Sequence, residues 1–526
     1  MQTLDLIIIF GYLIGITLFG IFYSGKQETT KDYFVGDRNV PWWAIAASIV
    51  ATETSTITFI SVPGIAFAKN GNFEFLQLVF GYMLGRVVIS LLFIPMYFKG
   101  ELFTVYQLLG DRFGEKVKML ASGLFVIMRN IADGIRLLLT AIVLAAVYVA
   151  FVPDANPNTI IVLSIILLGV VMIIFTFFGG MEAVIWVEVV QLGIYIFGAI
   201  AAAVVILNQV DGGMSKVLEI GSQFNKFNLF DFGIRDTKYF LPIPFLSEIQ
   251  FNLPFDFTKT FTFFAGLIGG CFLTMSTHGT DQYLVQRYLC TDKARSASFA
   301  LLSSGAVVLG QFIGFLFIGV LLFAFYQPFA LEGYATATGA FPFTGGDKIF
   351  PDFITKHMPT GLSGIVVAAI FAAALSSSLN SIAATFVQDL YKPLKKSADD
   401  KHLLRMASIL TVFFGIVQIL VALFVMKQER SALDSALSIA GLINGPILGV
   451  FLVGTFLKKA TQTHALIGML TSLTLMSYFL YLEFVKRFAI IPEATPVAWT
   501  WYVLIGSSTT FIVALIASLL FADKES

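Results

Sequence analysis

Residues 51–64 read ATETSTITFISVPG and interrupt a long apolar segment with a glutamate, six hydroxyl side chains and a proline. A helix that crosses lipid must satisfy its backbone polar groups internally, so such a stretch is tolerated only where it lines a protein-enclosed cavity. Pro63 removes an amide donor, and the hydroxyls of Ser55 and Thr58 can bond carbonyls that lose their helical partners. We therefore predict two half-helices around a polar gap within residues 41–68.

Glu53 favours this gap over a simple proline kink. An acidic side chain near the middle of a membrane costs about 3 kcal/mol or more unless it is paired or hydrated, so it indicates a path for a solute or an ion. A second segment, FTFFAGLIGGCFLTMSTHGTDQ at 261–282, carries Gly266, Gly269 and Gly270, which either weaken the helix or allow close packing. Two interrupted segments in two halves of a chain are typical of transporters with inverted repeats.

The composition indicates that the whole chain, residues 1–526, is one transmembrane domain. Of its residues, 57% are hydrophobic and 13% charged, where soluble proteins have about 25% charged. The 33 basic and 33 acidic residues cancel, so charge predicts no nucleic-acid partner. We predict an all-α polytopic membrane protein with about thirteen spans. The predicted spans are 4–24, 41–68, 73–98, 119–151, 159–178, 183–208, 260–277, 297–327, 361–388, 404–426, 432–457, 462–484 and 497–521.

Basic residues set the expected orientation, because short loops rich in Lys and Arg stay in the cytoplasm. They concentrate in alternate loops. Examples are Lys31 and Arg38, Lys99 and Arg112, Arg287 and Lys293, Lys392 and Lys395, and Lys458 and Lys459. We therefore expect the N-terminus outside and the C-terminus in the cytoplasm, with the connections at 210–258 and 328–360 forming ordered outer caps.

Three charged residues share one face of a predicted helix. Arg129, Asp133 and Arg136 stand at i, i+4 and i+7, so the aspartate can bridge both arginines. Such a cluster serves either as neutralised packing or as a solute contact.

Two further polar groups interrupt apolar segments. Glu188 lies about two turns inside a predicted helix, where a lone carboxylate indicates a cation. Ser376, Ser377 and Ser378 follow an alanine run. Their hydroxyls suit a desolvated Na⁺, although small residues also serve close helix packing.

Four stretches resemble the sodium:solute symporter family, which includes sodium/glucose, proline, iodide, monocarboxylate and sialic acid transporters. They are TVYQLLGDRFG (104–114), GGMEAVIWVEVVQ (179–191), GTDQYLVQRYL (279–289) and SSSLNSIAATFVQDLY (376–391). The resemblance implies the leucine-transporter fold, with two inverted five-helix repeats at 41–208 and 260–457. One extra helix (4–24) precedes the repeats and two (462–484 and 497–521) follow them.

The resemblance also implies a sodium site on the first broken helix and the eighth core helix. Its ligands are the carbonyls of Ala51, Thr54 and Ala373 and the hydroxyls of Ser376 and Ser377, counted forward from the helix start at GLSG. Counting backward from Asn380 instead places the hydroxyl positions on Ala373 and Ala374. We prefer the forward count because it supplies oxygen atoms. Glu188, where the family usually has aspartate, forms with Ser378 a candidate second site for a cation or a proton.

The sialic acid branch resembles this chain at Ser55, Thr58, Phe73 and Gln77, which implies that these residues contact the solute. With Glu53, Arg129, Asp133 and Arg136 they make up the predicted solute site. The expected function is Na⁺-coupled symport of a small polar organic solute, such as a sugar or a sugar acid like sialic acid, by alternating access.

The expected setting is a monomer in the plasma membrane, of the bacterial inner-membrane type. Proton coupling, monocarboxylate or amino-acid transport, a channel, and a transporter-like sensor or receptor stay open as alternatives. An enzyme is not expected, because the four histidines lack metal-ligand spacing and no H-E-x-x-H or G-x-S-x-G motif occurs.

Overall fold

The chain is described by a computed structural model that is 77% helical. The structure describes residues 2–23, 29–100, 102–152, 154–178, 180–243, 248–326, 346–375, 378–395, 397–426 and 432–521. The predicted sodium ligands Ser376 and Ser377, and the 328–345 part of the second predicted cap, lie outside the described residues.

Helices follow one another along almost the whole chain. The first half contains α1 (Thr3–Tyr23), α2 (Thr30–Val35), α3 (Trp42–Glu53), α4 (Thr56–Phe67), α5 (Leu76–Leu92), α6 (Ile94–Tyr97), α7 (Gln107–Phe113), α8 (Glu115–Phe151), α9 (Pro157–Phe178), α10 (Met181–Gln209) and α11 (Gly213–Gln223). After a hairpin of β1 (Thr237–Pro242) and β2 (Glu248–Leu253) come the π-helix η1 (Ala265–Gly269), α12 (Gly270–Gly279), α13 (Gln282–Leu289) and α14 (Ala294–Phe325). The rest contains η2 (Gly346–Lys348), α16 (Ile349–Lys356), α17 (Leu362–Leu375), α18 (Leu379–Thr385), η3 (Phe386–Tyr391), α19 (Lys392–Leu394), α20 (Asp400–Val425), α21 (Ala432–Phe456), α22 (Gln462–Arg487), η4 (Trp499–Trp501) and α23 (Tyr502–Leu520).

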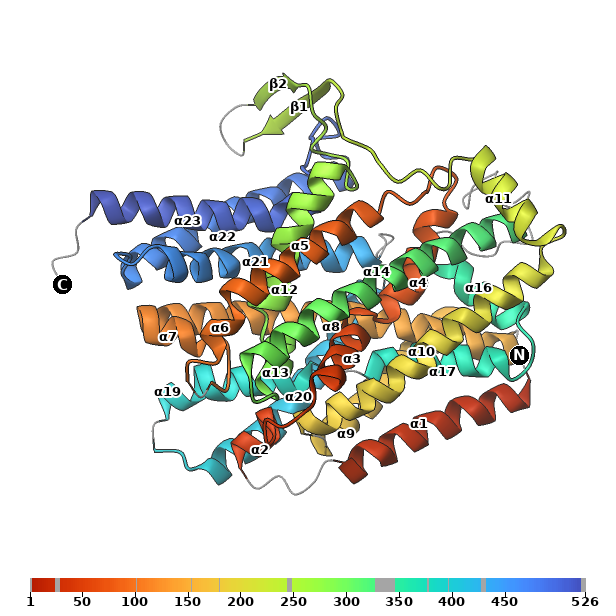
Figure 1. Cartoon of the computed structure of the whole chain (residues 1–526), viewed down its shortest axis with the longest axis horizontal. Coiled ribbons are helices and arrows are strands. Elements are labelled where there is room, and N and C mark those ends of the chain that lie inside the picture. The colour runs from red at the N-terminus through yellow and green to blue at the C-terminus, as the bar shows by residue number, and fades with distance from the viewer. Residues whose placement is uncertain are drawn as a thin grey trace.

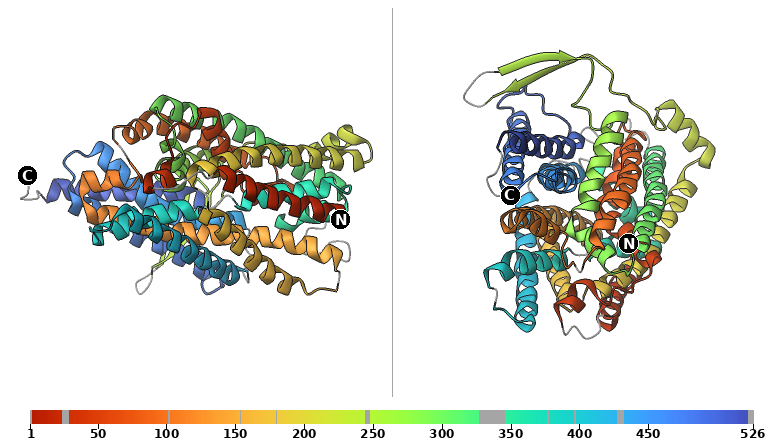
Figure 2. Two further views of the ribbon diagram at one scale, coloured as in Figure 1. Left: turned by 90° about the horizontal axis from the view of Figure 1, so that it is seen from below. Right: turned by 60° about the vertical axis from the view of Figure 1, so that its left-hand side comes forward.

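The long helices run along the long axis of the molecule (Figure 1). The beginning of α1 and the end of α23 lie at opposite ends of this bundle, and the view from below agrees (Figure 2). Short helices cover both ends, with α11 and α16 at the end where α1 begins and α7 and α19 at the other. The antiparallel β1–β2 hairpin is the exception to the predicted all-α fold, and it is held to the chain before η4 by paired bonds between Phe240 and Thr495.

The predicted break in the first segment is confirmed. Helix α3 ends at Glu53, α4 begins at Thr56, and the two helices are bent by 56°. The amide of Ser55 bonds the carbonyl of Glu53 at 2.9 Å, so the carbonyl of Ala51 loses the donor that a continuous helix would give it. Pro63 does not make the break, because it lies inside α4.

The glycines of the second segment do not unwind it. They form the π-helix η1 and the start of α12, and the chain turns later, between α12 and α13 at Thr280 and Asp281. A Cβ added to Gly266 would collide with the backbone of Gln77, and one added to Gly270 would lie 2.6 Å from the carbonyl oxygen of Leu78. These glycines therefore serve close packing between η1–α12 and α5, which was the alternative that the sequence left open.

Gly266→Ala is expected to destabilise the protein by about 1–3 kcal/mol, because the added methyl group overpacks a backbone contact. Gly310→Ala is the matched control: it also replaces a glycine by alanine within a long helix, and a Cβ there meets nothing within 4 Å. Alanine is the better helix former, so the control should be neutral or slightly stabilising. Unfolding by heat or denaturant in detergent measures both; equal stability of the two variants would contradict the packing role.

The described residues contain nine helices long and apolar enough to span a membrane, or ten when α3 and α4 count as one span. The remaining predicted spans, at 260–277, 361–388 and 432–457, fall on shorter or interrupted apolar helices. Several of the residues used for the orientation lie in short helices rather than in loops, among them Lys31, Arg112 and Lys392. Arg287 does not lie in a loop but in α13, with none of its surface exposed.

Candidate functional site

A polar cavity of about 190 Å³ lies beside the break in the first helix pair. The ends of α3 and α4 line it together with residues from α5, α8, α12, α13, α14 and α21. Six of the eight predicted solute contacts are among its lining residues: Glu53, Ser55, Thr58, Arg129, Asp133 and Arg136. Thr58 donates from its hydroxyl to the carbonyl of Glu53 at 3.2 Å. As expected, a hydroxyl side chain thus bonds a backbone carbonyl at the break.

Glu53 is paired inside the bundle. Its carboxylate forms an ion pair with Arg86 of α5, and its Oε2 lies 3.4 Å from Nε2 of His278 of α12. The side chains of Arg86 and His278 are only 1% and 5% exposed, whereas that of Glu53 is 12% exposed and lines the cavity. The acid therefore faces the cavity, with its positive partner behind it.

The predicted bridge over two arginines is only half correct. Asp133 forms an ion pair with Arg136, and it also accepts a hydrogen bond from the hydroxyl of Ser378. Arg129 instead lies 3.7 Å from Asp281, the residue that caps α13. Arg129 thus pairs with Asp281, from another part of the chain, and not with Asp133, one turn away on its own helix.

Three arginines lie around the aromatic ring of Tyr283. The guanidinium carbons of Arg129, Arg287 and Arg136 lie 4.4, 4.6 and 5.8 Å from the ring centroid. An aromatic face attracts such cations, so the ring stabilises charges that the membrane interior disfavours. Through this residue the cavity is in contact with the ion pair of Arg287.

Phe73 and Gln77 do not line the cavity in this structure. The amide of Phe73 bonds the carbonyl of Asn228 at 3.0 Å. Gln77 has none of its surface exposed: its Nε2 bonds the carbonyls of Glu74 and Phe261, and its Oε1 accepts from the amide of Asp231. Both residues are therefore engaged with the loop that covers the bundle between α11 and β1.

Ion pairs hold this loop in place. Lys259 Nζ lies 2.7 Å from Glu74 and 2.5 Å from Asp231, and Asp231 also pairs with Arg235. Burial tends to raise the pKa of Asp231, but hydrogen bonds from Arg235 and Lys259 outweigh it and lower that pKa to about 2. The covering loop thus keeps its charges at any physiological pH.

The start of α4, just after the break, lies next to α17. Thr56, the first residue of α4, donates from its hydroxyl to the carbonyl of Ile370 at 3.1 Å, one turn before Ala373. The carbonyl of Ala51 is released at the break, close to Thr54. The structure thus brings the broken helix and the predicted sodium helix together.

Glu188 and Ser378, the candidate second site, contact different groups. Glu188 has no exposed surface; its Oε1 lies 2.5 Å from Arg287 Nη2 and accepts from Thr52 at 3.1 Å, while Ser48 donates to Oε2. Ser378 contacts Asp133 instead. Arg287 thus supplies a positive charge where a second cation was expected.

Sequence reasoning missed several residues of this cluster: Arg86, His278, Asp281, Tyr283 and Arg287. One of them carried a signal. An arginine in the middle of an apolar helix marks a functional or paired position, and Arg86 is such a residue within α5. The others lie at or near the turn between α12 and α13, whose position the sequence did not reveal.

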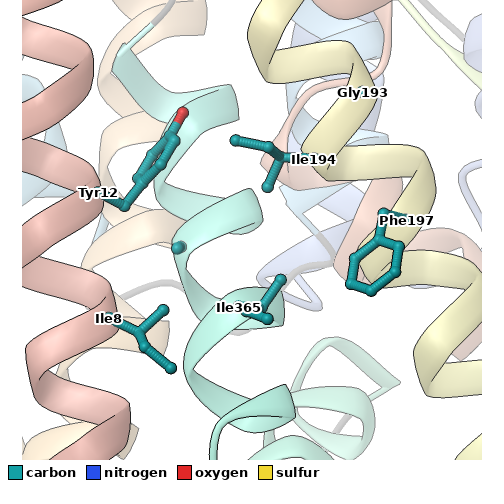
Figure 3. Close-up of a pocket in the computed structure, with 7 residues that line it drawn as sticks. Ile8, Tyr12, Gly193, Ile194, Phe197 and Ile365 are labelled. Atoms are coloured by element: carbon teal, nitrogen blue, oxygen red, sulfur yellow. The ribbon is translucent and has the colours of Figure 1, made fainter.

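A second pocket has a different character. It lies between α1, α10 and α17, has a volume of about 330 Å³, and is lined by Ile8, Tyr12, Gly193, Ile194, Phe197, Ile365 and Ala368. Figure 3 shows these apolar side chains around it, with the tyrosine as the one polar group. Without a charged residue, this pocket is not suited to a polar solute, and the cavity beside the break is the better candidate.

Comparison with known proteins gives one consistent result. The family model "Sodium:solute symporter family" matches residues 33–472. The chain is 30% identical to the sodium/sialic acid symporter NanT of Aliivibrio fischeri, over 99% of this chain and 94% of that protein. It is also 30% identical to the sodium/sialic acid symporter SiaT of Proteus mirabilis, over 98% and 95%.

Solved structures agree. A Na⁺-coupled sialic acid symporter in a substrate-bound outward-open state matches with a TM-score of 0.79 and 29% identity, over 99% of this chain and 98% of that one. A nucleobase-cation-symport-1 family transporter matches with a TM-score of 0.52 at 11% identity, over 94% and 95%, which supports the fold alone. The fold is therefore that of the leucine-transporter group, with sodium as the coupling ion. The chain belongs to the sodium:solute symporter family.

Proposed function

We propose that this chain carries a sugar acid, such as a sialic acid, into the cell together with sodium by alternating access. The two relatives at 30% identity are both sodium/sialic acid symporters and match nearly the whole chain. The observation that carries the proposal is the cavity at the broken helix, which is lined by an arginine that a solute can reach.

Arg129 is the proposed partner of the solute carboxylate. Its side chain is 15% exposed, compared with 8% for Arg136 and 1% for Arg86. Its one ion pair, to Asp281, is long at 3.7 Å, and its buried Nε has no hydrogen-bond partner in the described part of the chain. A guanidinium with free donors is suited to a carboxylate, which it can bind through two parallel hydrogen bonds.

The proposed sodium site consists of the carbonyls of Ala51, Thr54 and Ala373 and the hydroxyls of Ser376 and Ser377. Sodium there stabilises the broken helix and raises solute affinity through a coupling free energy of about 1–3 kcal/mol. Inward release is then driven by low internal sodium and by the membrane potential, which contributes about 2.3 kcal/mol per charge and 100 mV. Glu188 and Ser378 stay the candidates for a second cation or proton, which would have to displace Arg287.

The proposed topology has thirteen spans, with the N-terminus outside and the C-terminus in the cytoplasm of a monomer in a bacterial inner membrane. The opposite positions of α1's beginning and α23's end support an odd number of spans. The inverted repeats are proposed at 41–208 and 260–457, flanked by the helices at 4–24, 462–484 and 497–521.

Uptake of a radiolabelled sialic acid into proteoliposomes tests the proposal. We expect an inward sodium gradient, but not a potassium gradient, to drive accumulation. Arg129→Gln should weaken solute affinity about 10- to 100-fold, because a charge-assisted hydrogen bond contributes about 1.5–3 kcal/mol. Arg405→Gln, at an exposed arginine of α20, is the control and should leave affinity unchanged. Accumulation in potassium alone, or equal affinity in both variants, would refute the assignment.

A further inference from the structure

The carboxylate of Glu53 has one oxygen committed and one free. Arg86 and His278 both approach Oε2, and no donor of the described residues bonds Oε1. The residue lines the cavity, so its free oxygen is available to a bound molecule. Arg86 and His278, whose side chains are almost fully buried, hold the carboxylate in position.

An ionised carboxylate can only accept hydrogen bonds. Arg86 pairs with the carboxylate through Oε2, so the free Oε1 is an acceptor that still requires a donor. The matching solute groups are hydroxyl, amide N–H and ammonium groups. A second carboxylate or a halide at this place would face a negative oxygen and gain nothing.

The same cavity is also lined by a positively charged side chain, that of Arg129. This side chain is 15% exposed and its ion pair to Asp281 is long at 3.7 Å, whereas Glu53 offers an unused acceptor, and the hydroxyls of Ser55 and Thr58 also line the cavity. A solute that satisfies both charged groups has an anionic group together with hydrogen-bond donors. A site that selected by charge alone would also accept anions without hydrogen-bond donors.

We propose that Glu53, positioned by Arg86 and His278, is the specificity-determining residue of this transporter, and that it restricts the solute class to carboxylic acids that also bear hydroxyl or amide N–H donors. The inference rests on the proposed function and adds to it the residue that selects the solute. Simple aliphatic monocarboxylates and iodide are excluded, because they would leave the buried oxygen of Glu53 without a partner. Sites built to bond a substrate hydroxyl reject analogues without it by about 10⁴–10⁵-fold at best, so discrimination of at least about 10²-fold is expected here.

A binding panel on the purified full-length protein tests the class. N-acetylneuraminate, gluconate, butyrate and iodide are each titrated in sodium and in potassium, with thermal stabilisation and calorimetry as readouts. We expect the first two to bind in sodium only, and butyrate and iodide to bind at least 10²-fold more weakly. Butyrate or iodide binding as tightly as N-acetylneuraminate would overturn this inference but leave sodium symport standing. Failure of all four in sodium would overturn the proposed function and this inference with it.

A paired substitution tests the residue. Glu53→Gln together with Arg86→Met removes both charges with a small change of side-chain volume, so neither buried charge is left alone and the protein should fold. We expect the affinity ratio of N-acetylneuraminate to butyrate to fall at least tenfold, a change that a merely structural role would not produce. Glu115→Gln, at a 60% exposed acid on α8, is the matched control and should keep the ratio. An unchanged ratio in the folded double variant would refute the role of Glu53.

Discussion

Arg287→Met is expected to lower the free energy of unfolding by about 3–5 kcal/mol, the usual effect of removing one partner from a buried ion pair. Arg287 and Glu188 both have none of their surface exposed. The guanidinium lies 2.5 Å and 3.3 Å from the two carboxylate oxygens. Methionine has a similar length and packs well in apolar surroundings, so the loss is electrostatic rather than steric. Unfolding by denaturant in detergent measures the change.

Two further variants separate the ion pair from general damage at this position. Glu188→Gln combined with Arg287→Met removes both charges and should recover most of the lost stability. Lys216→Met is the surface control, because Lys216 pairs with Glu219, the two side chains are 45% and 63% exposed, and such pairs contribute at most about 1 kcal/mol. If the double variant were less stable than Arg287→Met, or if Lys216→Met cost as much, the ion pair would not be what stabilises this region.

The sequence predicted the break in the first helix pair because the signal is local. Hydroxyl density and an acidic residue within residues 51–64 are incompatible with a lipid-facing helix, and α3 does end at Glu53. The proline was a misleading detail. Pro63 packs inside α4, where the carbonyl it leaves free is only one turn from the true break.

The partners of the buried charges could not be predicted, because they come from distant parts of the chain. Glu53 and Arg86 are 33 residues apart, and Arg287 and Glu188 are 99 apart. Helical spacing suggested that Asp133 pairs with Arg129, but the capping residue Asp281 lies closer in the fold. Arg287 was counted among loop residues for the same reason: its run, GTDQYLVQRYL, is polar enough to resemble a loop, yet it forms a buried helix.

The glycine-rich segment illustrates the same limit. Weakening of a helix and close approach of two helices require the same residue, and only the neighbour decides between them. Here α5 lies against η1 and α12, so the glycines pack and the π-helix continues the helix. The candidate cavity was therefore predicted from one break, while the position of the second turn, at Asp281, came from tertiary structure.

Ser377→Ala is expected to abolish sodium-stimulated uptake while the protein still folds. Sodium needs several oxygen ligands once its water is removed, and the proposed set has five, of which two are serine hydroxyls. The carbonyl of Ala51, one of the proposed ligands, is released at the break. The bond from Thr56 to Ile370, one turn before Ala373, brings the other helix within reach. Ser377 follows Ala373 by another turn and lies outside the described residues, so function has to test it.

The experiment compares three proteins in proteoliposomes over a range of external sodium at fixed solute. Ser303→Ala is the control, because the hydroxyl of Ser303 bonds only carbonyls of its own helix, Phe299 at 2.7 Å and Ala300 at 3.1 Å. We expect wild type and Ser303→Ala to show the same rise of uptake with sodium, and Ser377→Ala to show none at equal expression and equal thermal stability. Unchanged sodium dependence in Ser377→Ala would favour the backward count from Asn380, in which alanines occupy the hydroxyl positions. The sodium would then be held by backbone carbonyls and by other side chains at the break, and the five-ligand assignment would be wrong.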